Sequence, residues 1–234
     1  MLHILSAFIV FLPVAFYVLY IIHFDIIKPE PPRALLLSAL VGGIAALAVI
    51  SIGMPSNPFP VDTEGGYGFM ESLDIGFVRL ALPAEVAKWL LLCIFLSLNR
   101  FYDEYLDGIV YSVCLAMGFM GVWGFRFLCA YVDTPSTFFI EIIQITVMIL
   151  IPIHFISGTF MGYFLGLARK KHRVLNHILA LSIPILTSGF LCTFVMMAGR
   201  HWTYYFAMGI ILSILAAITY TQIFRLQRMD RDNA

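Results

Sequence analysis

A glutamate and a lysine, Glu85 and Lys88, lie three residues apart in the middle of the apolar segment from Leu73 to Leu98. On a helix this spacing puts both side chains on one face. A segment of this length can cross a membrane, where each charged side chain costs about 2.5–3.5 kcal/mol. Such residues usually face the interior of a helix bundle and are functional-site candidates by default. A purely structural ion pair explains the same spacing equally well.

The composition is that of an integral membrane protein. Of the 234 residues, 61% are hydrophobic and 12% are charged, whereas a soluble domain is about 45–50% apolar and 25% charged. The formal net charge is zero, which gives no indication of a nucleic-acid partner. The four cysteines lie in apolar segments without a C-x-x-C pair. They are predicted to be small buried residues and not a disulfide or zinc-knuckle framework.

Apolar segments of about 20 residues predict an all-α bundle of about seven transmembrane helices, organised as one domain over residues 1–234. The segments are 2–23, 33–53, 73–98, 106–130, 138–168, 174–198 and 203–224. The first is interpreted as a retained helix and not a signal peptide. The fifth is too long for one straight crossing and contains Pro152, which predicts a kink, a tilt or an extension beyond the bilayer.

The segments between and after these helices carry their own signals. The connection 54–72 is rich in Gly and Pro and is predicted to be an irregular loop. The polar tail after Arg225 is predicted to be mobile. Within the fifth segment, Gly158, Gly162 and Gly166 recur every fourth residue and predict a smooth helix face for close packing.

Basic residues predict the orientation in the membrane. They gather in alternate connections and in the C-terminal tail, as Lys28, Arg33, Arg100, Arg169, Lys170, Lys171, Arg173, Arg225, Arg228 and Arg231. The opposite connections contain Arg200 alone. By the positive-inside rule, the N-terminus is outside and the C-terminus is cytoplasmic.

Two further polar residues lie at the same predicted depth as Glu85. With a rise of 1.5 Å per residue from the cytoplasmic helix ends, Glu85 lies roughly 20 Å deep, and His154 and Ser188 roughly 21 Å deep. A single histidine in an apolar helix is more often a hydrogen-bonded core residue. Its shared depth with a glutamate makes a joint functional site an equally good interpretation, provided that the helix faces converge.

Five short segments between Leu73 and Phe194 carry a family resemblance. They are Ala84-Glu85-Val86-Ala87-Lys88, Asp107-Gly108-Ile109-Val110-Tyr111, Gly118-Phe119-Met120-Gly121-Val122-Trp123-Gly124, His154 with Gly158 and Gly162 to Arg169, and Ser188-Gly189-Phe190-Leu191-Cys192. In these segments the chain resembles the PrsW family of intramembrane proteases, which is related to the CPBP group that includes CAAX-type prenyl-protein proteases.

The resemblance has gaps. The family's first motif is Glu-Glu-x-x-Lys, and Ala84 stands in place of its first Glu. The Glu and Asn of the Gly-Phe-x-x-x-Glu-Asn motif are replaced by Trp123 and Gly124. The last motif, His-x-x-x-Asp or Asn, falls on Ser188 and Cys192.

The resemblance implies peptide hydrolysis inside the membrane, which requires a polarised water and a stabilised oxyanion. Glu85 would be the general base or a metal ligand, and His154 the oxyanion stabiliser or a ligand. Lys88 would tune Glu85, and Ser188 would support the site. A catalytic zinc normally has three protein ligands. Glu85 and His154 supply two, and Cys192 as a thiolate is the candidate for the third.

The same resemblance implies a single-span or juxtamembrane protein substrate and a multi-pass location in the prokaryotic cell membrane. The role associated with the family is cleavage of an anti-sigma factor at its external side. Because Trp123, Ser188 and Cys192 replace family residues, a catalytically inactive pseudoprotease that binds membrane segments is an alternative. A small transporter or channel is a further alternative, which would call for broken helices paired by symmetry.

Overall fold

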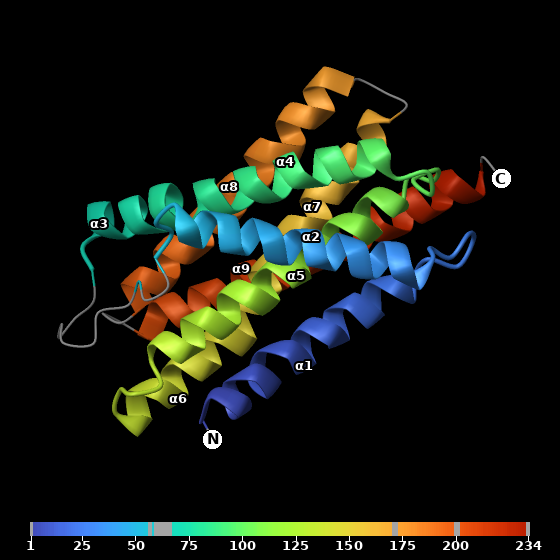
Figure 1. The fold of residues 1–234 in the computed structure, drawn as a ribbon. Helices are drawn as coiled ribbons and strands as arrows, with labels where there is room; N and C mark the ends of the chain where they lie inside the picture. The colour runs from blue at the N-terminus through green and yellow to red at the C-terminus, as the bar shows by residue number, and fades with distance from the viewer. Residues whose placement is uncertain (1, 56–57, 59–66, 170–172, 199–201, 233–234) are drawn as a thin grey trace.

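The computed structural model describes residues 2–55, 58, 67–169, 173–198 and 202–232, and every regular element among them is a helix (Figure 1). Figure 1 labels the α-helices, and η denotes a π-helical segment. In chain order the elements are α1 (Leu2–Ile22), α2 (Pro32–Ser51), α3 (Phe69–Leu73), η1 (Asp74–Ala81), α4 (Leu82–Leu98), α5 (Asp107–Ala130), α6 (Ser136–Ile145), η2 (Thr146–Leu150), α7 (Ile151–Ala168), α8 (Arg173–Ala198) and α9 (Trp202–Arg231).

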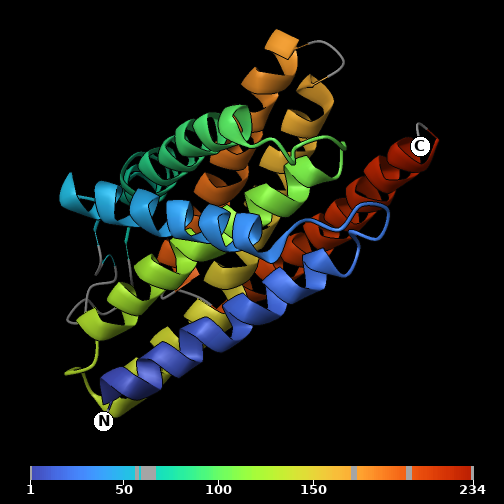
Figure 2. The same cartoon turned by 45° about the vertical axis from the view of Figure 1, so that its right-hand side comes forward.

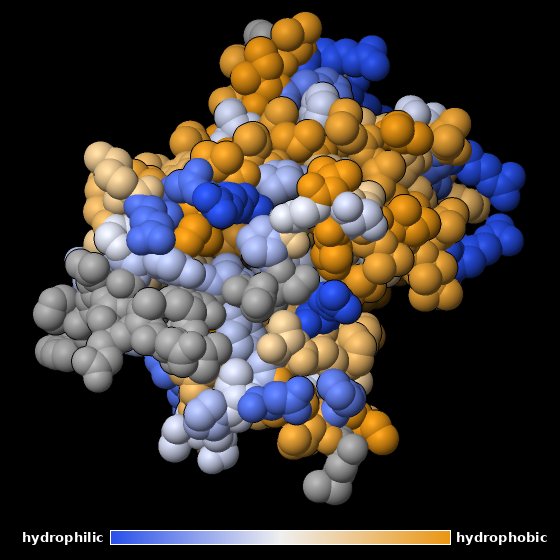
Figure 3. Space-filling model, turned by 60° about the vertical axis from the view of Figure 1, so that its left-hand side comes forward, coloured by the Kyte–Doolittle hydropathy of each residue, from blue (hydrophilic) through white to orange (hydrophobic). Residues whose placement is uncertain are grey.

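These elements join into seven continuous helices that are long and apolar enough to cross a membrane, counted over the described residues. The prediction of seven spans is therefore confirmed. Two of them are composite: Phe69–Leu98 contains α3, η1 and α4, and Ser136–Ala168 contains α6, η2 and α7. Figure 3 shows apolar side chains over a broad part of one face of the molecule, with hydrophilic side chains in separate patches.

Both composite helices change from π-helix to α-helix just before a proline. Pro83 follows η1, and Pro152 follows η2. Proline has no backbone N–H, and its ring clashes with the preceding turn of an α-helix. A widened π-turn accommodates both defects, and such turns are frequent at functional sites. The irregularity predicted at Pro152 is present in this form, and the one before Pro83 was not predicted.

Helix α5 is the centre of the bundle. Figures 1 and 2 show it crossing between the other helices, and it packs against α1, α2, α4 and α7. Its most apolar stretch is 67% buried, the largest share among the seven membrane-length helices. The residues of α5 therefore contact protein on almost every side.

Glycines allow α5 to approach its neighbours closely. A Cβ on Gly162 of α7 would lie 2.5 Å from the Cα of Ile109 in α5, and one on Gly158 would lie 2.8 Å from the Cβ of Ala116. A Cβ on Gly166 would collide with the carbonyl oxygen of Tyr105. The predicted packing face of Gly158, Gly162 and Gly166 is confirmed, and its partner is α5.

The structure differs from two predictions about polar segments. The mobile tail expected after Arg225 was wrong for residues 226–231, because helix α9 continues to Arg231. The carboxylate of Asp230 accepts hydrogen bonds from the backbone N–H groups of Tyr105 and Leu106, at 2.7 and 2.8 Å, which fixes this end of the helix. The loop predicted for 54–72 was wrong for its last residues, because helix α3 begins at Phe69; residues 54, 55, 58, 67 and 68 are non-helical, and residues 56–57 and 59–66 lie outside the described part.

The two ends of the chain lie at opposite ends of the bundle (Figure 1), as an odd number of spans requires. The α1–α2 and α4–α5 connections lie at the same end as the end of α9. This arrangement groups Arg100 with Arg228 and Arg231. Lys170, Lys171 and Arg200 lie outside the described residues, and the orientation itself remains a prediction.

Candidate functional site

The candidate site lies where α4, α7 and α8 meet beside α5. Glu85 follows Pro83 by two residues in the first turn of α4, and His154 follows Pro152 by two residues in the first turn of α7. Each side chain therefore comes directly after a π-to-α transition. Ser188 approaches from α8. Glu85, Lys88, His154 and Ser188 are all buried.

The ammonium of Lys88 connects the polar residues of the site. It lies 2.8 Å from Oε1 of Glu85 and 3.2 Å from Nδ1 of His154, and it donates to Oγ of Ser157 at 3.0 Å. An ammonium has three N–H donors, so these contacts can use all of them. The side chain of Lys88 is 1% exposed, and that of Glu85 is 0% exposed. Removing one partner of such a buried pair leaves an uncompensated charge.

The contact with Lys88 sets the tautomer of His154. With Lys88 as an ammonium, which donates and cannot accept, Nδ1 accepts, and the imidazole is then neutral with its proton on Nε2. The ring packs against Phe119, with centroids 5.4 Å apart, and Phe119 also lies 5.5 Å from the Lys88 nitrogen. His154 therefore has one N–H donor that Lys88 does not engage.

Glu85 has one engaged and one free carboxylate oxygen. Its Oε1 accepts from Lys88 and from the hydroxyl of Ser188, the latter at 2.8 Å. Its Oε2 is buried and has no hydrogen-bond partner among the described residues. The indole Nε1 of Trp123 is likewise buried and without a partner in the described part of the chain. A buried acceptor and a buried donor are thus both available.

These groups line one small cavity of about 20 Å³. Its walls include the positions that match the family motifs, namely Ala84, Glu85, Trp123, His154, Ser188 and Cys192. The structure therefore brings together residues that the sequence placed on four separate helices. A cavity needs about 10–15 Å³ to hold one water, so this space is large enough for a single water molecule.

The arrangement does not fit a metal ion held by Glu85 and His154. The Lys88 ammonium lies within hydrogen-bonding distance of both donors, and a metal between them would have to displace it. Among the described residues, the grouping of three metal-ligating side chains is Asp25, Glu104 and Asp107, without Cys192. The roles predicted for Glu85, His154 and Cys192 as ligands remain predictions.

Two contributors to the site were not identified from the sequence. Ser157 follows His154 by three residues and so lies on the same helix face. A search for hydroxyls one turn from each candidate would have found it. Phe119 gave no signal, because an aromatic residue in an apolar helix is indistinguishable from ordinary core.

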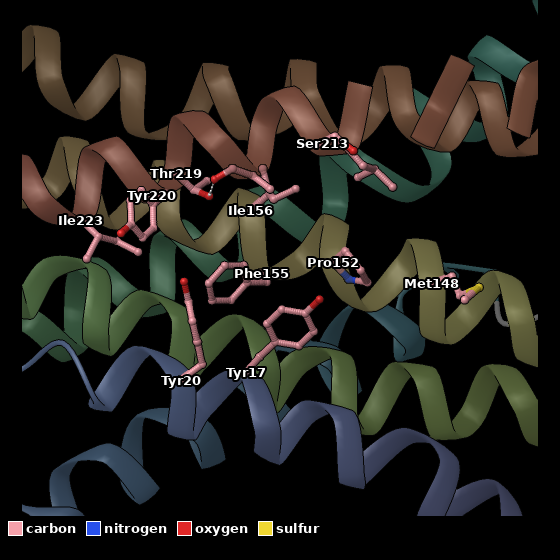
Figure 4. A pocket seen from close by; sticks show the side chains of 12 residues that line it. Tyr17, Tyr20, Met148, Pro152, Phe155, Ile156, Ser213, Thr219, Tyr220 and Ile223 are labelled. Carbon is pink, nitrogen blue, oxygen red and sulfur yellow. Dashed lines mark hydrogen bonds between the residues drawn. The ribbon is translucent and has the colours of Figure 1, made fainter. Parts of the chain in front are cut away.

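A larger cavity lies elsewhere on α7. It has a volume of about 320 Å³ and lies between α1, α7 and α9. Figure 4 shows Tyr17 and Tyr20 of α1 and Phe155 of α7 pointing into this space. None of the predicted site residues lines it. The candidate site is therefore in the small cavity.

Fold and site define a multi-pass α-helical membrane protein with a buried glutamate–lysine–histidine centre. Residues 30–220 match the family described as "PrsW family intramembrane metalloprotease". The chain belongs to this family. The matched range extends beyond the Leu73–Phe194 segment that carries the resemblance.

Curated relatives support the assignment. The chain is 28% identical over 182 residues to "Protease PrsW" of Bacillus subtilis, which covers 75% of each chain. It is 26% identical over 164 residues to "Protease PrsW" of Oceanobacillus iheyensis, covering 68% of this chain and 69% of the relative. A third relative of the same name, from Clostridioides difficile, is 31% identical over 142 residues, covering 58% of this chain and 57% of the relative. No solved structure matches the chain.

Proposed function

We propose that this protein is an intramembrane peptidase in which Glu85 acts as general base on a single water molecule. The observation that carries the proposal is the free Oε2 of Glu85 beside a cavity of about 20 Å³. A water there has an acceptor in Glu85 and a donor in the Trp123 indole. This environment supports the polarisation that a nucleophilic water needs.

The proposed step moves one proton. Glu85 takes a proton from the water as its oxygen attacks the carbonyl carbon of the peptide bond, and the oxyanion forms on the carbonyl oxygen. The Nε2–H of neutral His154 and the Nε1–H of Trp123 are the donors available to that oxyanion. The carbonyl then re-forms from the oxyanion, the C–N bond breaks, and the proton on Glu85 passes to the leaving nitrogen, which gives an amine and a carboxylic acid. Lys88 compensates the charge of the ionised Glu85 in the resting site.

The proposed substrate is a single-span or juxtamembrane protein segment, as in anti-sigma-factor cleavage. The proposed location is the prokaryotic cell membrane. The seven apolar helices and the bacterial relatives support this setting. A cavity of about 20 Å³ holds a water but not a peptide, so substrate binding requires helices around the site to separate.

The test is cleavage by purified full-length chain in liposomes that contain a tagged single-span anti-sigma factor. Glu85→Gln should reduce cleavage by about 100-fold or more, since general-base catalysis contributes about 10²–10⁴. The matched control is Glu141→Gln, which alters an exposed glutamate of α6 that accepts from Tyr205. Cleavage by Glu85→Gln at the wild-type rate would contradict the assignment.

Zinc held by Glu85, His154 and Cys192 is the metal-dependent form of the prediction, and the present arrangement does not accommodate it. It requires Lys88 to move out of its present contacts. In the same assay, loss of cleavage on chelation and recovery on adding zinc would favour this form. Cleavage unaffected by a zinc chelator would favour the metal-independent base.

A pseudoprotease that binds membrane segments is the second candidate. The small volume of the cavity and the Glu85–Lys88 ion pair favour it, because both also suit a purely structural centre. Its signature is stable capture of the tagged single-span protein by wild type without any cleavage product. Family membership gives no support to the transporter or channel alternative.

A further inference from the structure

Three buried carboxylates form a cluster at the end of the bundle that carries the C-terminus. The acidic cluster consists of Asp25 in the α1–α2 connection, Glu104 in the α4–α5 connection and Asp107 at the start of α5. One oxygen from each lies within 4.8 Å of the others. Their exposed fractions are 5%, 7% and 0%. None of the three lines the cavity of the candidate functional site.

Backbone hydrogen bonds hold two of these carboxylates by one oxygen only. Oδ2 of Asp25 accepts from the N–H of Glu30 at 2.8 Å. Oδ2 of Asp107 accepts from the N–H groups of Asp103 and Glu104, at 2.8 and 2.6 Å. The Oδ1 atoms of Asp25 and Asp107 are buried and have no partner among the described residues. Two desolvated oxygens are therefore left without a donor, and the carboxyl of Glu30 lies beside that of Asp107.

No ion pair among the described residues compensates the cluster. Lys28 lies nearby but pairs with Asp103 at 3.3 Å, on the exposed side. Several adjacent buried carboxylates are costly to ionise unless a positive charge joins them.

The donor set indicates which positive charge fits. All three ligands are carboxylate oxygens, and hard cations such as Mg²⁺ and Ca²⁺ prefer oxygen ligands. Zinc and copper sites normally include imidazole or thiolate ligands, and the cluster contains neither. We propose that the acidic cluster binds a hard divalent cation, Mg²⁺ or Ca²⁺, that fastens the α1–α2 and α4–α5 connections to the start of α5.

A bound cation would add to an existing contact between the α4–α5 connection and helix α9. Asp230 of α9 accepts from the N–H groups of Tyr105 and Leu106, directly between Glu104 and Asp107 in sequence. Removing the cation should loosen this end of the bundle. This inference concerns a site separate from the peptidase centre and does not depend on its activity.

The test measures thermal unfolding of purified full-length protein after chelation, during separate titrations with Mg²⁺ and Ca²⁺. The unfolding midpoint should rise with the logarithm of the cation concentration above the dissociation constant, by about 5 °C or more at a hundredfold excess. Glu104→Gln and Asp25→Asn should abolish the rise. The matched control Asp103→Asn, an exposed neighbour that pairs with Lys28, should keep it.

The competing explanation is that the carboxylates share protons. In that case neither cation changes the midpoint up to about 10 mM, above the range of weak calcium sites. Glu104→Gln would then be at least as stable as wild type, because the change removes an ionisable carboxyl from the cluster and Glu104 holds no cation. That pair of results would overturn the proposal. The cation that begins to raise the midpoint at the lower concentration is the preferred occupant.

Discussion

At the scale of single residues, Lys88 holds the candidate site together. Its ammonium has acceptors on Glu85, His154 and Ser157, which come from two helices. The same contacts set the tautomer of His154 and leave one oxygen of Glu85 free. Glu85 is therefore both a member of the ion pair and the proposed general base. Mutations at this site must be read for their effects on stability and on activity separately.

Lys88→Met tests the structural part. It leaves the Glu85 carboxylate buried without its cation, and breaking a buried pair costs about 3–5 kcal/mol. We expect a strong fall in the level of folded protein in membranes. The double variant Glu85→Gln with Lys88→Met should recover most of that level, because no unpaired charge remains. Wild-type abundance of Lys88→Met alone would show that the pair does not stabilise the fold.

Trp123→Phe tests the proposed oxyanion donor. The change removes the unpartnered Nε1–H and keeps an aromatic ring in the cavity wall. Loss of one oxyanion donor typically costs about 10²–10³ in kcat, so we expect cleavage to fall by that factor at unchanged abundance.

The matched control for Trp123→Phe is Trp89→Phe. The indole nitrogen of Trp89 is also buried without a partner among the described residues, but Trp89 does not line the cavity. Its replacement should leave the kcat for cleavage unchanged. An equal loss of activity in both variants would mean that Trp123 acts through packing and not as a donor.

At the scale of helices, glycine determines how closely α5 and α7 approach. Gly162→Ala would place a Cβ 2.5 Å from the Cα of Ile109, on backbone that has no flexible end to move. We expect destabilisation of about 1–3 kcal/mol from overpacking, measured as a lower unfolding midpoint. Gly209→Ala in α9 is the control, because nothing lies within 4 Å of its added Cβ. If the unfolding midpoint of Gly162→Ala equals that of Gly209→Ala, then α5 and α7 can move apart to accept the added Cβ without loss of stability.

Helix positions were predictable from sequence because about 20 apolar residues are needed to cross a bilayer. The shared depth of Glu85, His154 and Ser188 was predictable too, since depth depends only on residue count and rise. The rotation of each helix was not predictable. It depends on η1 and η2, whose widened turns shift the face that Glu85 and His154 present. The convergence of those faces required the structure.

At the scale of the whole molecule, the polar ends escaped prediction because their partners lie far apart in the sequence. Asp230 follows a polar segment that resembles a mobile tail, and only its bonds to Tyr105 and Leu106 show that it is fixed. Asp25 and Asp107 lie in different connections, and neither forms a motif alone. Local patterns cannot indicate such contacts.

The last prediction concerns orientation, which the distribution of basic residues sets as N-terminus outside. It is tested in a variant without native cysteines, by labelling intact cells with a membrane-impermeant maleimide. Asp133→Cys, exposed in the α5–α6 connection, should react in intact cells. Arg100→Cys, exposed in the α4–α5 connection, should react only after permeabilisation. The reverse pattern would place the acidic cluster outside the cell, where Ca²⁺ and not Mg²⁺ would be its expected occupant.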